Sequence, residues 1–109
     1  MNILYIGSSG ALSLLPFEKL LASEHSIVAV GLSNPVLLQD KVIALENASL
    51  ALSANQNLIP LLDLTLPLAA VLDQCRSIDF DVILMSCYGS RLADDLIRLA
   101  DRGCFNLHP

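Results

Sequence analysis

The chain carries little positive charge. Lys and Arg number 6 against 11 acidic residues, which gives a formal net charge of −5 over 109 residues. The basic residues are not clustered, whereas surfaces that bind nucleic acid or anionic membranes concentrate them. The composition therefore argues against a dedicated surface of either kind.

Cysteine is scarce, and its spacing is not that of a metal site. The 3 cysteines are Cys75, Cys87 and Cys104, and no two of them have C-x-x-C spacing. An odd number without ligand spacing predicts reduced thiols, with neither a disulfide framework nor a metal site. We expect a cytoplasmic protein on this basis.

Long uninterrupted apolar runs are lacking. The most apolar tract, residues 58–72, is broken by Pro60, Asp63 and Pro67, whereas a spanning helix needs about 20 consecutive apolar residues. No basic residue precedes Lys19, although signal peptides begin with positive charge. The sequence therefore predicts no membrane span.

Apolar side chains are what the chain has in abundance. They make up 54% of the residues, and charged side chains make up 16%, where about 25% charged is usual. This balance excludes disorder. It predicts strands that are buried on both faces, or a surface that another part of the protein covers.

Apolar periodicity predicts strands that alternate with helices. Unbroken apolar runs indicate strands, and apolar residues three or four apart indicate helices. We expect strands over residues 2–6, 26–30, 58–62, 81–85 and 104–108, and helices over 11–23, 41–57, 65–75 and 92–102. Strict alternation predicts an α/β, Rossmann-like doubly wound parallel sheet.

The helix ends carry further expectations. Pro16 is tolerated in the first helix, in which Ser13 lies off the apolar stripe, and Thr65 is the expected N-cap of the third. The last helix is the clearest, because acidic residues in its first turn and Arg residues in its last suit the helix dipole, and Gly103 ends it.

Ligands of open parallel sheets bind beyond the carboxyl ends of the strands. Three segments are expected there: residues 7–11, residues 86–91 and whatever follows His108. The first has the pattern Gly-x-x-Gly and lacks the Lys of a phosphate-binding loop. It is either a tight strand-to-helix turn or an anion site at a helix N-terminus.

Asn106 and His108 project to the same face of the last predicted strand, because side chains alternate along a strand. An amide donor beside an imidazole suits a carbonyl reaction, in which Asn106 donates to an oxyanion and His108 moves a proton. The alternative is a buried His that bonds to a neighbouring backbone group.

Three segments supply the context. They read Met-Asn-Ile-Leu-Tyr-Ile-Gly at residues 1–7, Asp-Val-Ile-Leu-Met-Ser-Cys-Tyr-Gly at 81–89, and Gly-Cys-Phe-Asn-Leu-His-Pro at 103–109. With them the chain resembles the N-terminal domain of the formyltetrahydrofolate-dependent formyltransferases, nearest to the tRNA-formylating members. The resemblance runs over essentially the whole chain and is most specific in its last thirty or so positions.

The resemblance implies residue roles. Asn106 and His108 take the places of the family's catalytic Asn and His. The family's folate-binding loop falls on Ser86, Cys87, Tyr88, Gly89, Ser90, Arg91 and Leu92. The implied formyl donor is 10-formyltetrahydrofolate, and the implied acceptor is an amine, on methionyl-tRNA first and on a sugar nucleotide second.

The resemblance also implies that residues 1–109 are the N-terminal portion of a formyltransferase domain, ending just after Asn-Leu-His-Pro. The fold would then be incomplete at its C-terminal end, and the missing partner would be the rest of the same domain. The family's catalytic Asp, which orients the His, lies further downstream, so we expect these residues alone to be inactive or nearly so.

Two other interpretations come from different classes of protein. A receiver-like regulatory module would need acidic residues after the first strand, and Gly7-Ser8-Ser9-Gly10 supplies none. A non-catalytic α/β nucleotide- or folate-binding module stays open. Cys87 could be a reactive thiol, although a buried Cys is usually a small apolar residue.

Overall fold

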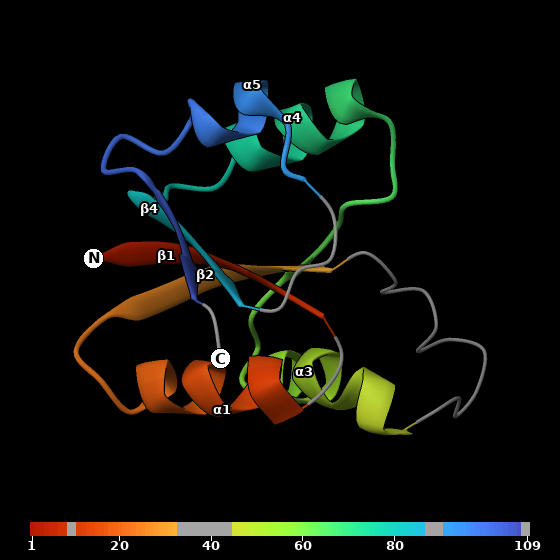
Figure 1. Ribbon diagram of the computed structural model, residues 1–109, viewed down its shortest axis with the longest axis vertical. Helices are drawn as coiled ribbons and strands as arrows, with labels where there is room; N and C mark the ends of the chain where they lie inside the picture. The colour runs from red at the N-terminus through yellow and green to blue at the C-terminus, as the bar shows by residue number, and fades with distance from the viewer. Residues whose placement is uncertain (9–10, 33–44, 87–90, 108–109) are drawn as a thin grey trace.

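The computed structural model describes residues 1–8, 11–32, 45–86 and 91–107 (Figure 1). The strands are β1 (Asn2–Gly7), β2 (Ser26–Leu32), β3 (Leu61–Asp63), β4 (Val82–Ser86) and β5 (Cys104–Leu107). The helices are α1 (Ala11–Leu21), α3 (Leu45–Gln56), α4 (Leu68–Arg76) and α5 (Asp94–Ile97).

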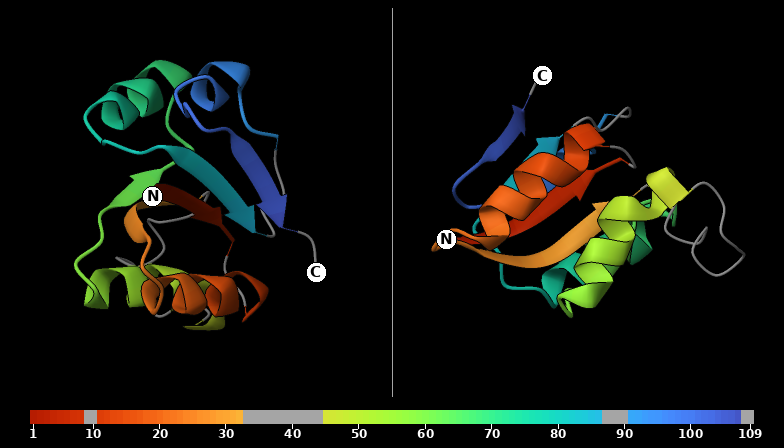
Figure 2. Two further views of the ribbon diagram at one scale, coloured as in Figure 1. Left: turned by 90° about the vertical axis from the view of Figure 1, so that its left-hand side faces the viewer. Right: turned by 90° about the horizontal axis from the view of Figure 1, so that it is seen from below.

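The strands form one sheet in the order β3-β2-β1-β4-β5, and every neighbouring pair is parallel. Helices α1 and α3 cover one face of this sheet, and α4 and α5 cover the other (Figures 1 and 2). The predicted Rossmann-like doubly wound arrangement is therefore confirmed.

Burial on both faces explains the apolar composition. One core cluster joins the sheet to α4 and α5 around Leu4 and Ile83, and a second joins it to α1 and α3 around Tyr5 and Phe17. The rings of Tyr5 and Phe17 lie 5.6 Å apart and are tilted by 50°. Alternate residues of the central strand thus enter opposite cores, which a parallel strand covered by helices requires.

The prediction of a long helix over residues 92–102 is wrong. Helix α5 has four residues, and beyond it Leu99 N–H donates to the Leu96 carbonyl three residues back. Such bonds tighten the chain into single turns. Arg102 N–H then donates to the Asp81 carbonyl at 2.8 Å, and Gly103 has a φ of 103°. The chain is drawn back to the sheet before a longer helix can form.

Two predicted boundaries around β3 also differ. The strand spans Leu61–Asp63, later than the predicted 58–62, because Leu58 has a φ of 58° and lies in a turn. Thr65 does not cap α4, whose N-cap is Pro67. Instead, the Thr65 N–H and hydroxyl both donate to the Asp63 carboxylate, which closes a turn at the end of the strand.

Strand β5 lies at the edge of the sheet and is thinly covered. Phe105 is 54% exposed and Leu107 is 38% exposed. Both project to the face that α1 lies on, because the alternate residue Cys104 packs against the core beneath α4 and α5. The last described strand therefore presents an open apolar face. None of the helices in the described part of the chain is long and apolar enough to cross a bilayer.

Candidate functional site at the carboxyl edge of the sheet

The chain changes direction across the sheet between β1 and β4. From β1 it passes through α1 to β2 on one side, whereas β4 is reached through α4 on the opposite face. Gly7 pairs with Ser86, and Ser86 pairs with Leu107. The carboxyl ends of β1, β4 and β5 thus form one row, at the point where open α/β sheets bind ligands.

Asn106 lies in this row of strand ends, beside Met85 of β4. It is exposed and follows Cys104 by two residues, so it projects to the α4–α5 face of the sheet. The neighbouring position, His108, lies outside the described residues. The juxtaposition of Asn106 and His108 therefore stays a prediction.

The predicted folate loop is described at its two ends. Cys87, Tyr88, Gly89 and Ser90 lie outside the described residues. Ser86 is buried, and its hydroxyl donates to the Leu12 carbonyl at 3.1 Å. Its side chain is thus already bonded within the fold, so its contribution to a ligand is expected through position or backbone.

Arg91 and Leu92, at the other end of that loop, differ sharply. Leu92 is buried against Leu96 in the core beneath α4 and α5. Arg91 is exposed and pairs with Asp94 at 3.6 Å, with side chains 87% and 65% exposed. A pair this open contributes at most about 1 kcal/mol. The Arg91 guanidinium is therefore free to exchange Asp94 for an anionic ligand.

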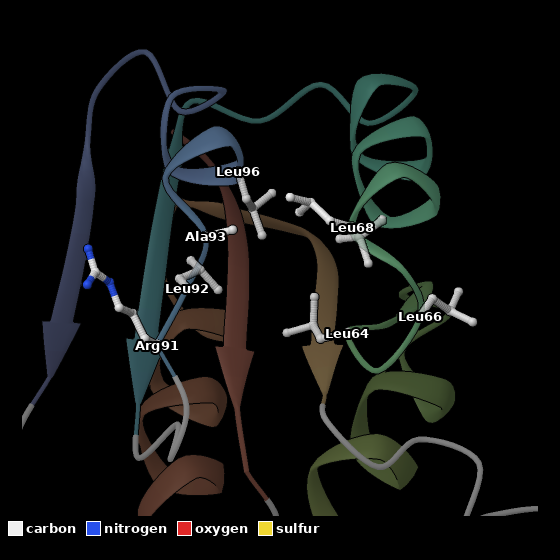
Figure 3. Close-up of a pocket in the computed structure, with 8 residues that line it drawn as sticks. Leu64, Leu66, Leu68, Arg91, Leu92, Ala93 and Leu96 are labelled. Carbon is white, nitrogen blue, oxygen red and sulfur yellow. The ribbon is translucent and has the colours of Figure 1, made fainter.

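Two hollows adjoin these residues. The first, of about 150 Å³, lies between α4, α5 and the chain after β3. Figure 3 shows Leu64, Leu68 and Leu96 turned toward the space between them, whereas the Leu66 and Arg91 side chains extend away from it. The lining residues are Leu64, Leu66, Leu68, Val71, Arg91, Leu92, Ala93 and Leu96. The sequence interpretation missed those before residue 91, and their two-residue leucine spacing was the available signal.

The second hollow, of about 410 Å³, is lined by Arg91, Leu92, Ala93 and Asp94. Sites for ligands of cofactor size usually enclose about 300 to 1,000 Å³. The first hollow can therefore hold part of such a ligand, and the second is an open surface depression beside it. Arg91 borders both, which makes it the described cation best placed to meet a ligand here.

A buried hydrogen-bond network joins α1 to the strand ends. The Ser13 hydroxyl accepts from the Ser8 N–H at 3.0 Å and donates to the Ser86 carbonyl at 2.7 Å. Ser13 lies off the apolar stripe of α1, yet it is fully buried. Pro16 has no N–H to give to the Leu12 carbonyl, and the Ser86 hydroxyl donates to that carbonyl instead.

The described thiols are buried in part or in full. Burial raises the pKa of Cys75 and of Cys104 above the ordinary value, which keeps both thiols protonated near neutral pH. Cys87 lies outside the described residues. Within the described ranges, no group of three or more His, Cys, Asp or Glu side chains is placed to hold a metal ion.

The chain is distantly similar to a known protein. The chain is 26% identical over 110 residues to methionyl-tRNA formyltransferase from Orientia tsutsugamushi (strain Boryong). The match covers 100% of this chain and 35% of that protein, so the chain spans about a third of the length of its relative. No protein-family model matches. The comparison supports a distant, formyltransferase-like relationship.

Proposed function

We propose that the chain is the folate-binding part of a formyltransferase domain that uses 10-formyltetrahydrofolate as formyl donor. The observation that carries the proposal is the row formed by Gly7, Ser86 and Leu107 at the switch point of the sheet. It brings the predicted catalytic strand and the predicted folate loop to one edge. The distant relationship to methionyl-tRNA formyltransferase extends over the whole chain and supports the same assignment.

The proposed reaction moves one carbon unit between two nitrogens. The acceptor amine forms a bond to the formyl carbon, and a tetrahedral oxyanion results. Asn106 is exposed at the carboxyl edge, and its amide is proposed to donate to that oxyanion, as preorganised donors do in acyl transfer. The bond to N10 of the folate then breaks. We assign to His108 the proton that N10 gains as the acceptor nitrogen loses one.

The proposed acceptor is the amino group of methionyl-tRNA, with a sugar-nucleotide amine as the second candidate. Transfer also needs a carboxylate to orient His108, because an imidazole without such a partner loses its fixed tautomer and orientation. The resemblance to the formyltransferases implies an Asp outside residues 1–109 for this role. Residues 1–109 alone are therefore expected to bind the folate and to transfer its formyl group very slowly or not at all.

A titration tests the binding half of the proposal. The 109-residue chain is titrated with 5-formyltetrahydrofolate, a stable reduced folate, by isothermal calorimetry. Saturable binding is expected, and Arg91→Ala should weaken it, because that guanidinium borders both hollows and can meet the folate carboxylates. Arg76→Ala is a matched control, since Arg76 is also exposed and paired with an Asp three residues away.

The alternative is a non-catalytic module that binds a nucleotide at the same edge. A parallel titration with AMP separates the two. Binding of AMP without binding of the reduced folate would replace the proposed function with this alternative. Equal losses of folate affinity for Arg91→Ala and Arg76→Ala would show that Arg91 does not contact the folate. The wild-type titration alone would then decide whether the chain binds folate.

A further inference from the structure

Ser13 lies off the apolar stripe of α1, yet its side chain does not face solvent. It is the third residue of α1, and its side chain is completely buried against the carboxyl ends of two strands. Its hydroxyl bonds to the main chain on both sides of the switch point: to the Ser8 N–H, just after β1, and to the Ser86 carbonyl, at the end of β4.

Both bonds need the same oxygen. One hydroxyl accepts from a main-chain N–H while it donates to a main-chain carbonyl, which an alkyl side chain cannot do. Without it, the two main-chain groups would lose their partners in a place that is partly or fully closed to water. A buried polar group without a partner is costly enough to move the backbone that carries it.

Ser13 is itself held in place. The Tyr5 hydroxyl donates to the Ser13 carbonyl, and the Ser86 hydroxyl donates to the Leu12 carbonyl at 3.1 Å. Two strands therefore fix the same turn of α1, the turn that Pro16 deprives of a main-chain donor.

Close packing fixes the approach as well. A Cβ built on Gly7 would lie 3.0 Å from the Ser13 oxygen and 2.7 Å from Leu50 Cδ2. Glycine is what lets β1 end this near to the helix. Packing around Gly7 and Leu50 thus fixes the distance between the Ser13 hydroxyl and the two strand ends.

We infer that Ser13 is the positioning residue of the ligand site, because it sets where the chain leaves β1 and where it leaves β4. The inference rests on the proposed function and deepens it: the proposed folate site lies at the carboxyl edge of the sheet, and Ser13 holds the ends of β1 and β4 at that edge. Ser13 itself touches no ligand in this assignment.

The test compares three variants of the 109-residue chain. Ser13→Ala removes both clamping bonds. Ser13→Thr keeps the hydroxyl and serves as the conservative rescue. Tyr5→Phe removes a buried hydroxyl that donates to the Ser13 carbonyl in the same turn of α1, and it leaves the Ser13 hydroxyl in place. Urea denaturation first establishes that each variant is folded, so that affinities are compared between folded proteins.

Two readouts follow. Ser13→Ala is expected to weaken binding of 5-formyltetrahydrofolate about tenfold, the effect of losing about 1.4 kcal/mol, and to speed amide hydrogen exchange in peptides that cover residues 8–12 and 84–92. Ser13→Thr keeps the hydroxyl, so its affinity and exchange should lie closer to the wild type than those of Ser13→Ala. Tyr5→Phe should lower stability without changing affinity.

Equal shifts in affinity for Ser13→Ala and Tyr5→Phe would overturn the inference, because loss of stability would then explain both. Unchanged affinity and exchange in Ser13→Ala would also overturn it. If the wild-type chain binds no reduced folate, the proposed function fails, and the exchange data alone decide whether Ser13 orders the two strand ends.

Discussion

The Ser13 hydroxyl donates to the Ser86 carbonyl across 73 residues of sequence, at a distance of 2.7 Å. Ser86 returns a bond to the same helix, because its own hydroxyl donates to the Leu12 carbonyl. This reciprocal pair ties α1 to the end of β4, the strand from which the predicted folate loop begins. Because Pro16 has no N–H, the Leu12 carbonyl lacks a donor within α1, and the bond from Ser86 supplies that donor.

The first prediction concerns Pro16. Ser86→Ala should cost about 1–3 kcal/mol of unfolding free energy in the wild type, because the Leu12 carbonyl loses its donor. In a Pro16→Ala background the same change should cost less, since residue 16 then has an N–H that can reach that carbonyl. A double-mutant cycle by urea denaturation measures the difference, and strict additivity of the two changes would contradict it.

Gly7 carries the second prediction. Gly7→Ala should lower the free energy of unfolding by about 1–3 kcal/mol, because the added methyl meets Leu50 and Ser13 within a packed core. Gly31→Ala is the matched control, since its nearest neighbours stand at 3.2 Å rather than 2.7 Å and its cost should be smaller. Thermal or urea unfolding ranks the two, and a reversed order would show that the Leu50 side chain moves aside at little cost.

A third prediction concerns high pH. Burial raises the pKa of the Cys75 thiol, so the folded state keeps its proton where the unfolded state has lost it. The resulting stabilisation is complete below the unfolded pKa of about 8.5 and is lost as pH rises through the higher folded pKa. The free energy of unfolding should therefore fall above that pH. In Cys75→Ala it should fall less steeply with pH.

The control for this third prediction is Cys104→Ala. Its thiol is less buried and lies on the edge strand, although burial raises its pKa as well. The change in slope should be smaller than for Cys75→Ala. Identical pH slopes for the wild type and Cys75→Ala between pH 8 and 10 would show that the thiol keeps its ordinary pKa in the fold.

The open face of β5 gives the fourth prediction. Phe105 and Leu107 are exposed on an edge strand, where unpaired backbone and apolar side chains favour association. The chain should self-associate as concentration rises in sedimentation velocity, and Phe105→Lys should reduce this. Leu58→Asn is the control, because Leu58 is 90% exposed but lies in the turn before β3, at the opposite edge of the sheet from β5. A monomeric wild type at all concentrations would contradict the prediction.

Much of the fold followed from local pattern. Unbroken apolar runs at residues 2–6, 26–30 and 81–85 fall on β1, β2 and β4, because strands covered on both faces have no polar side to alternate with. Boundaries were less well predicted where tertiary bonds intervene. The helix expected over 92–102 is cut short by the bond from Arg102 to Asp81, a partner that is distant in sequence.

The candidate site also has parts that the sequence predicted and parts that it could not predict. Position along a strand was sufficient to place Asn106 at the carboxyl edge, whereas the predicted folate loop after Ser86 stays a prediction. The role of Ser13 could not be predicted, because a polar residue off an apolar stripe normally faces solvent. Its burial depends on strand ends that meet α1 in the folded protein.

By itself, the sequence determined the alternation of strands and helices, the parallel sheet and the strand ends at which a ligand site can form, because apolar periodicity acts through local geometry and burial. The tertiary structure alone decided the order of the strands, the exposed face of β5 and the clamp between Ser13 and Ser86. Those features depend on which groups meet across long stretches of chain, where an unpaired carbonyl or N–H must find its partner.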